Sequence, residues 1–459
     1  MGILQKQIKN NSALLVLCLA SFLVPFMGSA MTLSLPQIGK SFSMGAISQS
    51  WIATIYLITT AIFQVPFARL ADMFGRKKAF ILGLALFGIS TFLSGLAPSG
   101  TILIALRALT GLCCAMMFGT SMAILVSLFP AQSRGKIIGI NTAVVYFALA
   151  SGPFLGGMLI QHFGWQSLFF VIGILGFVLA ICASIIFKNQ EWIESEGESF
   201  DYSGSAIYAF ALFGLIFGFS ELPKTFGLIF IAIGIVCFVA FVLYELKNKE
   251  PVFNVRIFSG NKVFGLSCLS SLINYACTAA VAFMLSLYLQ CIRGFEPHYA
   301  GLILIVQACV QCIISLFAGR LSDRINPSII ATVGMGIIVI GLAGLIFITA
   351  NTSMSFIILL LTLLGLGFGL FASPNSTVIM SSVDKKYYGQ ASAIMGTMRL
   401  TGQAFSMGIA TMSISLYLGN KIITPNLHTD FMKSFQTTFI ICAILCVVGT
   451  YASSFRVKK

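Results

Sequence analysis

Long apolar runs alternate with short polar segments along the whole 459-residue chain. Each run reaches roughly 18 residues or more, enough for a helix to cross the ~30 Å hydrocarbon core of a bilayer. Membrane β-strands would instead give ~10-residue segments of alternating polarity. The pattern predicts an all-α polytopic membrane protein with fourteen spans, near 12–34, 49–68, 78–97, 100–128, 136–160, 166–187, 204–222, 225–245, 262–290, 298–319, 328–349, 354–380, 388–417 and 434–455.

Composition and charge agree with this class. The chain is 58% hydrophobic and 9% charged, which excludes an ordinary soluble domain. Its net charge of +14 comes from basic residues scattered at the ends of apolar runs, so no nucleic-acid partner is expected. With both termini inside, 20 of the 27 Lys and Arg residues lie on the cytoplasmic side. This bias predicts a cell-membrane protein with cytoplasmic termini and the lipid bilayer as partner.

The sequence shows no pattern that indicates a metal site or an enzyme active site. The twelve cysteines lie almost entirely inside apolar runs, and the three histidines fall in connecting segments without metal-ligand spacing. The cysteines are interpreted as small buried hydrophobes, and neither a metal nor a cofactor is expected. No embedded His, Asp or Glu pair could serve as acid and base, and no G-x-x-x-x-G-K loop occurs. An enzyme is therefore not expected.

An internal repeat organises the chain. "ARLADMFGRK" at 68–77 is echoed by "GRLSDRINPS" at 319–328, each at the cytoplasmic end of the second span of a six-helix block. Asp72 and Asp323 are too far apart for a simple six-helix duplication, and the seventh and eighth spans account for the surplus. Two related halves around a central site are typical of alternating-access carriers.

This repeat predicts three units. They are an N-terminal six-helix half (1–190), an inserted helix pair with cytoplasmic linkers (191–261) and a C-terminal six-helix half (262–459). The acidic linker at 188–203 is expected to be solvated. We expect a monomer.

The charged stretch "ARLADMFGRKK" (68–78) stands between two apolar runs. Asp72 is expected near a helix N-terminus or paired with a base at the membrane rim, and Gly75 permits a tight turn. The stretch resembles the loop motif of the major facilitator superfamily, G-x-L-A-D-R-x-G-R-K, and departs from it at the first Gly and first Arg. The resemblance implies a latch between the halves, with Asp72, Gly75, Arg76 and Asp323 as conformational-switch residues.

The fifth span contains "ALASGPFLGGMLIQHFGW". A Gly-Pro followed by Gly-Gly predicts a kink and a smooth face for close helix packing. The G-P-x-x-G-G pattern also resembles the antiporter signature of the drug-efflux branch of the same superfamily. That resemblance gives Gly152, Pro153, Gly156 and Gly157 a role in the conformational switch.

Two cations lie inside apolar spans. Arg107 is ~10 Å from the outer end of its span and Arg399 ~16 Å from the inner end. Each costs roughly 2.5–3.5 kcal/mol to insert, so both are expected to face a cavity or a partner. Both match positions of the fourteen-span drug:proton antiporter group, and the resemblance covers essentially the whole chain. It implies multidrug efflux: export of hydrophobic small molecules by alternating access, with protons as the coupling ion.

One departure from that group leaves an alternative open. The group carries an Asp in its first span, where this chain has Met27 within "MGSAMTLSLP". None of the thirteen acids is expected at mid-membrane, so no embedded carboxylate is available there to take up and release a proton. Two positive charges without a negative one favour neutral or anionic substrates. The alternative function is therefore an exporter or facilitator of an endogenous organic anion without classical proton coupling.

Other polar residues inside spans are candidates for substrate contact or coupling. An interhelical hydrogen bond, worth ~0.6 kcal/mol on average, is an equally good interpretation of each. They are Asn141, Tyr146, Asn274, Tyr275, Gln307, Gln311, Asn375 and Gln403.

Overall fold

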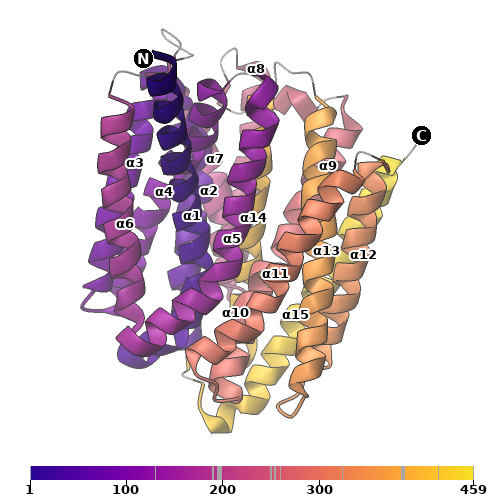
Figure 1. Cartoon of the computed structure of the whole chain (residues 1–459). Coiled ribbons are helices and arrows are strands. Elements are labelled where there is room, and N and C mark those ends of the chain that lie inside the picture. Colours follow the sequence, from indigo (N-terminus) through magenta and orange to yellow (C-terminus); the bar gives the residue numbers. More distant parts are fainter. Residues whose placement is uncertain are drawn as a thin grey trace.

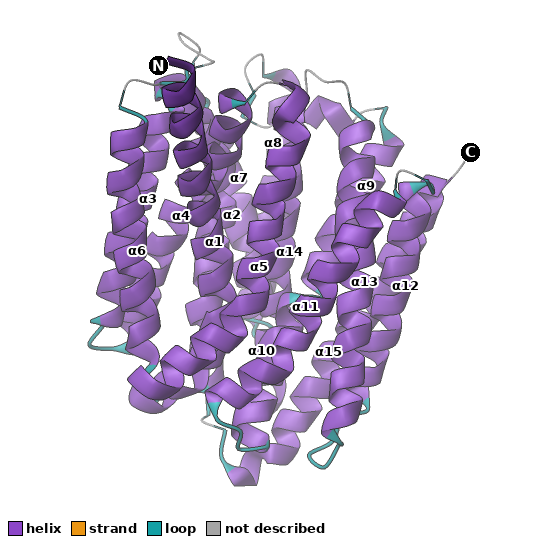
Figure 2. Cartoon of the chain, in the orientation of Figure 1, coloured by secondary structure: helices purple, strands orange, loops and turns teal. Residues whose placement is uncertain are grey.

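The computed structural model describes residues 2–129, 131–188, 191–193, 199–248, 251–252, 255–258, 260–322, 324–383, 388–421 and 423–457. Throughout this part of the chain the regular structure is helical (Figures 1 and 2). The α-helices are α1 (Gly2–Ser41), α2 (Ala46–Phe74), α3 (Arg76–Gly95), α4 (Gly100–Leu128), α5 (Ala131–Phe163), α6 (Trp165–Ile186), α7 (Tyr202–Ser220), α8 (Thr225–Lys247), α9 (Lys262–Ala276), α10 (Ala279–Leu287), α11 (Pro297–Leu321), α12 (Pro327–Ile346), α13 (Met354–Ser381), α14 (Tyr388–Tyr417) and α15 (His428–Ser454).

The predicted fold class is confirmed. Within the described residues, 13 helical stretches are long and apolar enough to cross a membrane, and α9 and α10 together count as one of them. The remaining predicted span corresponds to α14, which is 30 residues long. Polar residues such as Arg399 and Gln403 lower the hydropathy of α14. Each predicted span therefore has a helical counterpart.

The ninth predicted span is not one helix but two. The carbonyl oxygen of Asn274 accepts hydrogen bonds from Cys277 N (3.2 Å) and Thr278 Oγ1 (2.7 Å), which ends α9. The first turn of α10 then donates from Ala280 N to Ser406 Oγ on α14 (2.9 Å). Since a backbone group inside a bilayer needs a partner within the protein, this side chain makes the interruption tolerable. The predicted span over 262–290 is confirmed, but it consists of two helices and not one.

The helices form two groups joined by a few long contacts. In the first group α2 packs on α4, α3 on α6 and α1 on α5; in the second α12 and α11 pack on α13, and α9 on α14. The joins between the groups are α5 with α11 and α2 with α14. Helices α7 and α8 pack mainly on each other, and α7 also touches α2 and α14. The α7–α8 pair thus lies against a seam between the groups.

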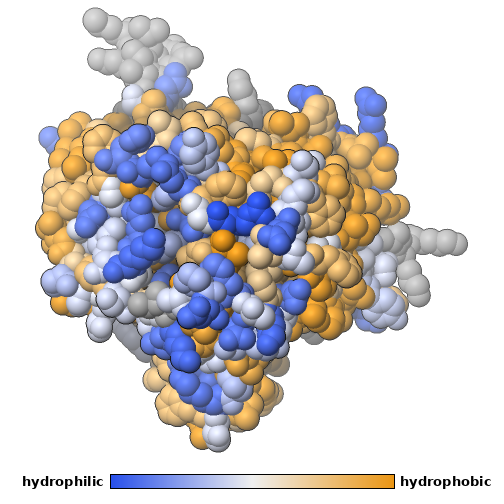
Figure 3. Space-filling model, turned by 90° about the horizontal axis from the view of Figure 1, so that it is seen from below, coloured by the Kyte–Doolittle hydropathy of each residue, from blue (hydrophilic) through white to orange (hydrophobic). Residues whose placement is uncertain are grey.

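Both termini lie at the same end of the bundle (Figure 1), here called the terminal end; the opposite end is the far end. Seen from the far end, hydrophilic residues gather across the middle of the face and apolar residues form the rim (Figure 3). An apolar belt around polar ends is what a bilayer requires.

A set of hydrogen bonds between described residues of the two groups lies at the far end. We call this contact zone the far-end seam. Its bonds are Ser286 Oγ to Thr32 O (2.7 Å), Gln290 Nε2 to Leu33 O (3.3 Å), Ser50 Oγ with Thr411 Oγ1 (2.8 Å), Ser48 Oγ to Asn420 Oδ1 (3.1 Å), Ala46 N to Lys421 O (3.3 Å) and Gln161 with Glu296 (2.7 Å) and His298 (2.5 Å).

Candidate functional site

The charged loop is built on the end of α2. Because α2 continues to Phe74, Asp72 lies in its last turn and not at a helix N-terminus. The carboxylate pairs instead with Arg76, whose Nε is 2.5 Å from Asp72 Oδ1. Gly75 has φ +116°, a conformation that residues with a Cβ rarely adopt. The structure therefore supports the pairing interpretation of Asp72 and the turn at Gly75. The predicted partner acid Asp323 lies outside the described residues.

Part of the acidic linker packs on this loop. Glu191 Oε1 accepts from Lys77 N (3.0 Å), and Trp192 O accepts from Arg76 N (3.0 Å). A carboxylate at the first turn of α3 stabilises the exposed N–H groups of the helix start. The expectation of a solvated linker is wrong at these two residues, because the backbone of the α2–α3 turn supplies donors that the linker satisfies.

The glycines of the fifth span separate into two kinds of contact. A Cβ on Gly152 or Gly156 would meet Ser29 Oγ (1.9 Å) or Ala30 Cβ (2.3 Å) of α1, within the first group. A Cβ on Gly157 would lie 2.9 Å from His298 Cα at the start of α11, in the second group.

Pro153 contributes from the same segment. Its carbonyl oxygen would be 2.1 Å from a Cβ on Gly301 of α11. The segment thus packs on α1 with one face and closes the far-end seam with the other. Its assignment to the conformational switch stays a prediction, and this geometry is consistent with it.

Arg107 is sealed between α2 and α4. The residue is 1% exposed, and its Nε donates to Ile52 O on α2 (3.3 Å). Its guanidinium carbon lies 4.4 Å from the ring centroid of Tyr56, also on α2. A desolvated cation over an aromatic face gains about 2 kcal/mol, which offsets much of the insertion penalty. The partner of Arg107 is therefore a helix neighbour.

Arg399 is only half-buried and lies where the two groups meet. Its guanidinium carbon is 5.6 Å from the Phe118 ring centroid on α4. It also interacts electrostatically with three tyrosines, which are Tyr56 on α2, Tyr146 on α5 and Tyr275 on α9. Arg399 and Phe118 are each about ten residues, hence about 15 Å, from the terminal end of their helices. We call these five residues plus Arg107 the central cluster.

Several predicted polar residues lie on the same helices. Asn141 and Asn274 are buried, and Asn141 Oδ1 and Asn274 Nδ2 have no hydrogen-bond partner among the described residues. Tyr146 interacts through its side chain with Ser315 of α11, which links the groups at this level. Of the remaining three, the backbones of Gln307 and Gln311 pack on α13, and Gln403 follows Gly402, whose Cβ would lie 2.8 Å from Tyr275 Cβ.

Asn375 belongs to a different network. It is 1% exposed, and its Nδ2 donates to Ser271 Oγ (2.8 Å) and Ser267 O (3.3 Å). Its Oδ1 accepts from Arg456, which also donates to Ser267 Oγ (2.9 Å). Burial lowers the pKa of Arg456 to about 10, so the network holds a cation at neutral pH. Asn375 is thus an interhelical hydrogen-bonding residue at the terminal end of the second group.

Sequence reasoning missed four residues that the structure brings forward. Tyr56 and Phe118 carried no signal because aromatic residues are abundant in the spans. Arg456 lies beyond the last apolar run, where a basic residue is typical of a cytoplasmic end. Gln64 is a buried polar residue of α2 whose type and depth resemble those of the predicted residues; its Nε2 would lie 2.8 Å from a Cβ on Gly396 of α14.

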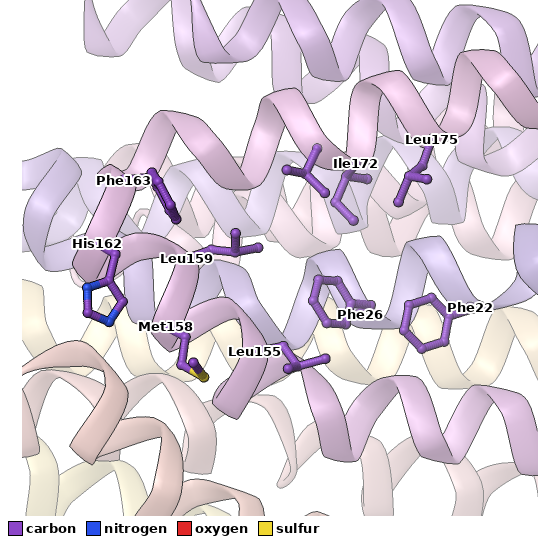
Figure 4. A pocket seen from close by; sticks show the side chains of 10 residues that line it. Phe22, Phe26, Leu155, Met158, Leu159, His162, Phe163, Ile172 and Leu175 are labelled. Carbon is purple, nitrogen blue, oxygen red and sulfur yellow. The ribbon is translucent and has the colours of Figure 1, made fainter.

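A separate cavity lies on the side of the first group (Figure 4). It has a volume of ≈ 420 Å³ and is lined by apolar side chains of α1, α5 and α6, with His162 near Phe163 at one end. None of the central-cluster residues lines it.

The sequence profile of the Major Facilitator Superfamily matches residues 17–407 and 267–458. This match covers most of the chain, and the chain belongs to that superfamily of membrane transporters. Its fold and family are thus those of transporters and not of enzymes, which implies a small-molecule substrate and a lipid environment.

Individual relatives and solved structures show which transporters the chain resembles. The chain is 27% identical to the riboflavin transporter RibZ of Clostridioides difficile over 97% of each chain. It is also 27% identical to the multidrug resistance protein Stp of Mycobacterium tuberculosis, over 91% of this chain and 79% of that protein. Among solved structures, it resembles a bacterial homologue of the lysosomal transporter Spinster in an inward-facing, unoccupied conformation, with TM-score 0.72 at 16% identity over 98% and 97% of the two chains. The resistance-protein relative is consistent with the drug:proton antiporter group.

Proposed function

We propose that the chain exports hydrophobic small molecules across the cytoplasmic membrane by alternating access, in exchange for protons. The observation that carries this proposal is the central cluster. Aromatic and polar side chains from both helix groups converge on a half-buried cation at mid-depth, as a site exposed alternately to each side requires.

We propose that both termini lie in the cytoplasm. The distribution of basic residues supports this orientation. The position of both termini at one end of the bundle (Figure 1) fits an even number of spans. In this orientation the far-end seam closes the outer side, as an inward-facing state requires. In this arrangement residues 1–190 and 262–459 are the rocking halves and 191–261 the inserted pair. The protein acts as a monomer without a nucleic-acid partner.

The relatives are named for transport of, or resistance to, more than one kind of compound. One is named for multidrug resistance and another for riboflavin transport. Identities of 27% leave room for different binding residues, so the central cluster and not the family selects the substrate. Gln307, Gln311, Gln403, Asn141 and Asn274 are proposed to complete the site around it.

The test is transport by the purified protein in liposomes. Uptake of a panel of hydrophobic dyes is measured with and without an imposed pH gradient, for the parent and for Arg399→Ala. We expect gradient-dependent transport that the substitution abolishes while the protein stays monodisperse. Gly28→Ala is the matched control, because a Cβ there meets nothing within 4 Å. Transport that ignores Arg399 would contradict the proposed site.

A second candidate is an exporter or facilitator of an endogenous organic anion without proton coupling. The observation that favours it is the placement of the described acids, such as Asp72, Glu221 and Glu296, at helix ends or in loops. No carboxylate among the described residues pairs with Arg399 or Arg107. Transport unchanged by collapsing the pH gradient would favour this candidate over antiport.

A further inference from the structure

The central cluster contains two cations, but only one of them is available to a ligand. Arg107 is 1% exposed, is bonded to a backbone carbonyl and lies under the ring of Tyr56. Arg399 is half-buried, and no hydrogen bond or ion pair to it is found within the described residues. The Tyr56 ring lies over the Arg107 guanidinium (4.4 Å), and Tyr56 also interacts electrostatically with Arg399. A ligand that reaches Arg399 meets one positive charge.

The surroundings of that charge are aromatic. Phe118 lies against the guanidinium, and Tyr146 and Tyr275 approach it from the two helix groups. Guanidinium planes bind carboxylates through two parallel hydrogen bonds and also stack on aromatic rings. Aromatic side chains in turn favour flat ring systems in offset or edge-to-face contact. The cluster therefore offers one bidentate anion contact next to several ring faces.

We propose that the substrates are planar aromatic molecules that carry a single carboxylate. This inference rests on the proposed carrier function and names the substrate class of its site. The carboxylate binds Arg399, and the ring system lies against Phe118, Tyr146 and Tyr275. A second carboxylate finds no second cation, because Tyr56 covers Arg107. A cationic analogue of the same shape is repelled by Arg399 in a medium of low dielectric constant.

The experiment compares four probes that share a naphthalene ring in liposomes containing the intact protein. They are the monocarboxylate, the neutral carboxamide, the aminomethyl cation and the 2,6-dicarboxylate. We expect the parent to transport the monocarboxylate roughly 10- to 100-fold better than the cation or the dicarboxylate, as one charge-assisted contact implies. Arg399→Gln should remove this preference among the charged probes in the transport that remains. Arg399→Lys, which keeps the charge but not the fork, should retain part of it.

The role of Tyr56 has its own readout. Tyr56→Leu uncovers Arg107 and should raise dicarboxylate transport at least several-fold relative to monocarboxylate. Tyr56→Phe keeps the ring over the cation and should leave the ratio unchanged. A merely structural role of Tyr56 would lower transport of all four probes together.

The outcomes separate the two proposals. Failure of the parent to transport any probe or dye overturns the carrier proposal and this inference with it. Transport in which the cation or the dicarboxylate equals the monocarboxylate overturns the inference alone. Preference that survives in Arg399→Gln also overturns it. If Arg399→Gln does not yield folded protein, the ranking of probes by Arg399→Lys and the two Tyr56 variants decides.

Discussion

A single methyl group at Gly157 should push the carrier out of the observed conformation. A Cβ at this position would lie 2.9 Å from both His298 Cα and Pro297 O, which are backbone atoms of the opposite helix group. Real Cβ contacts are longer than this, and backbone cannot rotate away as a flexible side chain does. Gly157→Ala therefore strains the far-end seam, and opening the seam relieves the strain.

The size of the effect follows from the cost of overpacking. Inserting one methylene into a closely packed contact costs about 1–3 kcal/mol. If the cost falls only on the conformation with a closed far end, the equilibrium shifts toward the open one by roughly 5- to 150-fold. Helix propensity does not oppose the substitution, since Ala is the better helix former.

The assay is the distance between two spin labels across the far end. Lys40 at the end of α1 and Asn426 before α15 are exposed and belong to different groups. Pulsed electron resonance on the doubly labelled parent should give one dominant distance. Gly157→Ala should add or enlarge a longer distance.

Two matched glycines make the result specific. Gly28→Ala meets nothing within 4 Å and should leave the distances unchanged. Gly156→Ala meets Ala30 within the same group, so it should lower the melting temperature without moving the distances. If Gly157→Ala gives the same distribution as the parent and as Gly28→Ala, then the seam is not strained at this contact and the reasoning is refuted.

Three further outcomes follow from the same structure. Gln161→Ala removes the hydrogen bonds of this residue to Glu296 and His298. The population ratio of the longer to the shorter label distance should rise by roughly 2- to 10-fold, less than for Gly157→Ala. An unchanged ratio would show that Gln161 does not stabilise the seam. Arg456→Met should lower the free energy of unfolding by about 1–3 kcal/mol, because the hydrogen-bonding partners of Arg456 are left buried. The melting temperature in detergent should fall while transport per folded molecule stays unchanged. Lost transport at unchanged stability would contradict this role. Gly75→Ala should lower the free energy of unfolding by about 1–3 kcal/mol, because the φ of this residue is +116° and its Cβ would lie 2.7 Å from Glu191 Oε1. Adding Glu191→Ala should recover part of the loss. Full additivity in this double-mutant cycle would show that the contact is absent.

The fold was readable from the sequence because a bilayer imposes a length and a polarity on every span. Hydropathy predicts each span, and among the described residues only α14 falls short of the other 13 stretches, since it carries Arg399 and other polar groups. The break between α9 and α10 was not readable. Its acceptor, Ser406, is supplied by a helix 126 residues further along the chain.

The site was predictable in its depth but not in its pairing. An embedded Arg is conspicuous in any span, so Arg107 and Arg399 could be singled out. Their burial could not be predicted, because it depends on packing by other helices: Arg107 is sealed against α2, whereas Arg399 is half-buried. Likewise the partner of Asn375 is Arg456, 81 residues away, a pairing that no local pattern encodes.

The interruption at Cys277 and Thr278 divides one membrane span into two helices, α9 and α10. Ser286, which seals the far end against Thr32, is on the short α10, whereas Tyr275 is on α9, which packs on α13, α14 and α15. The backbone bonds at the interruption are short-range ones, from Thr278 N to Tyr275 O (3.2 Å) and from Val281 N to Thr278 O (3.2 Å). A contact of the far-end seam and a residue of the central cluster thus lie on two different helical segments of one predicted span.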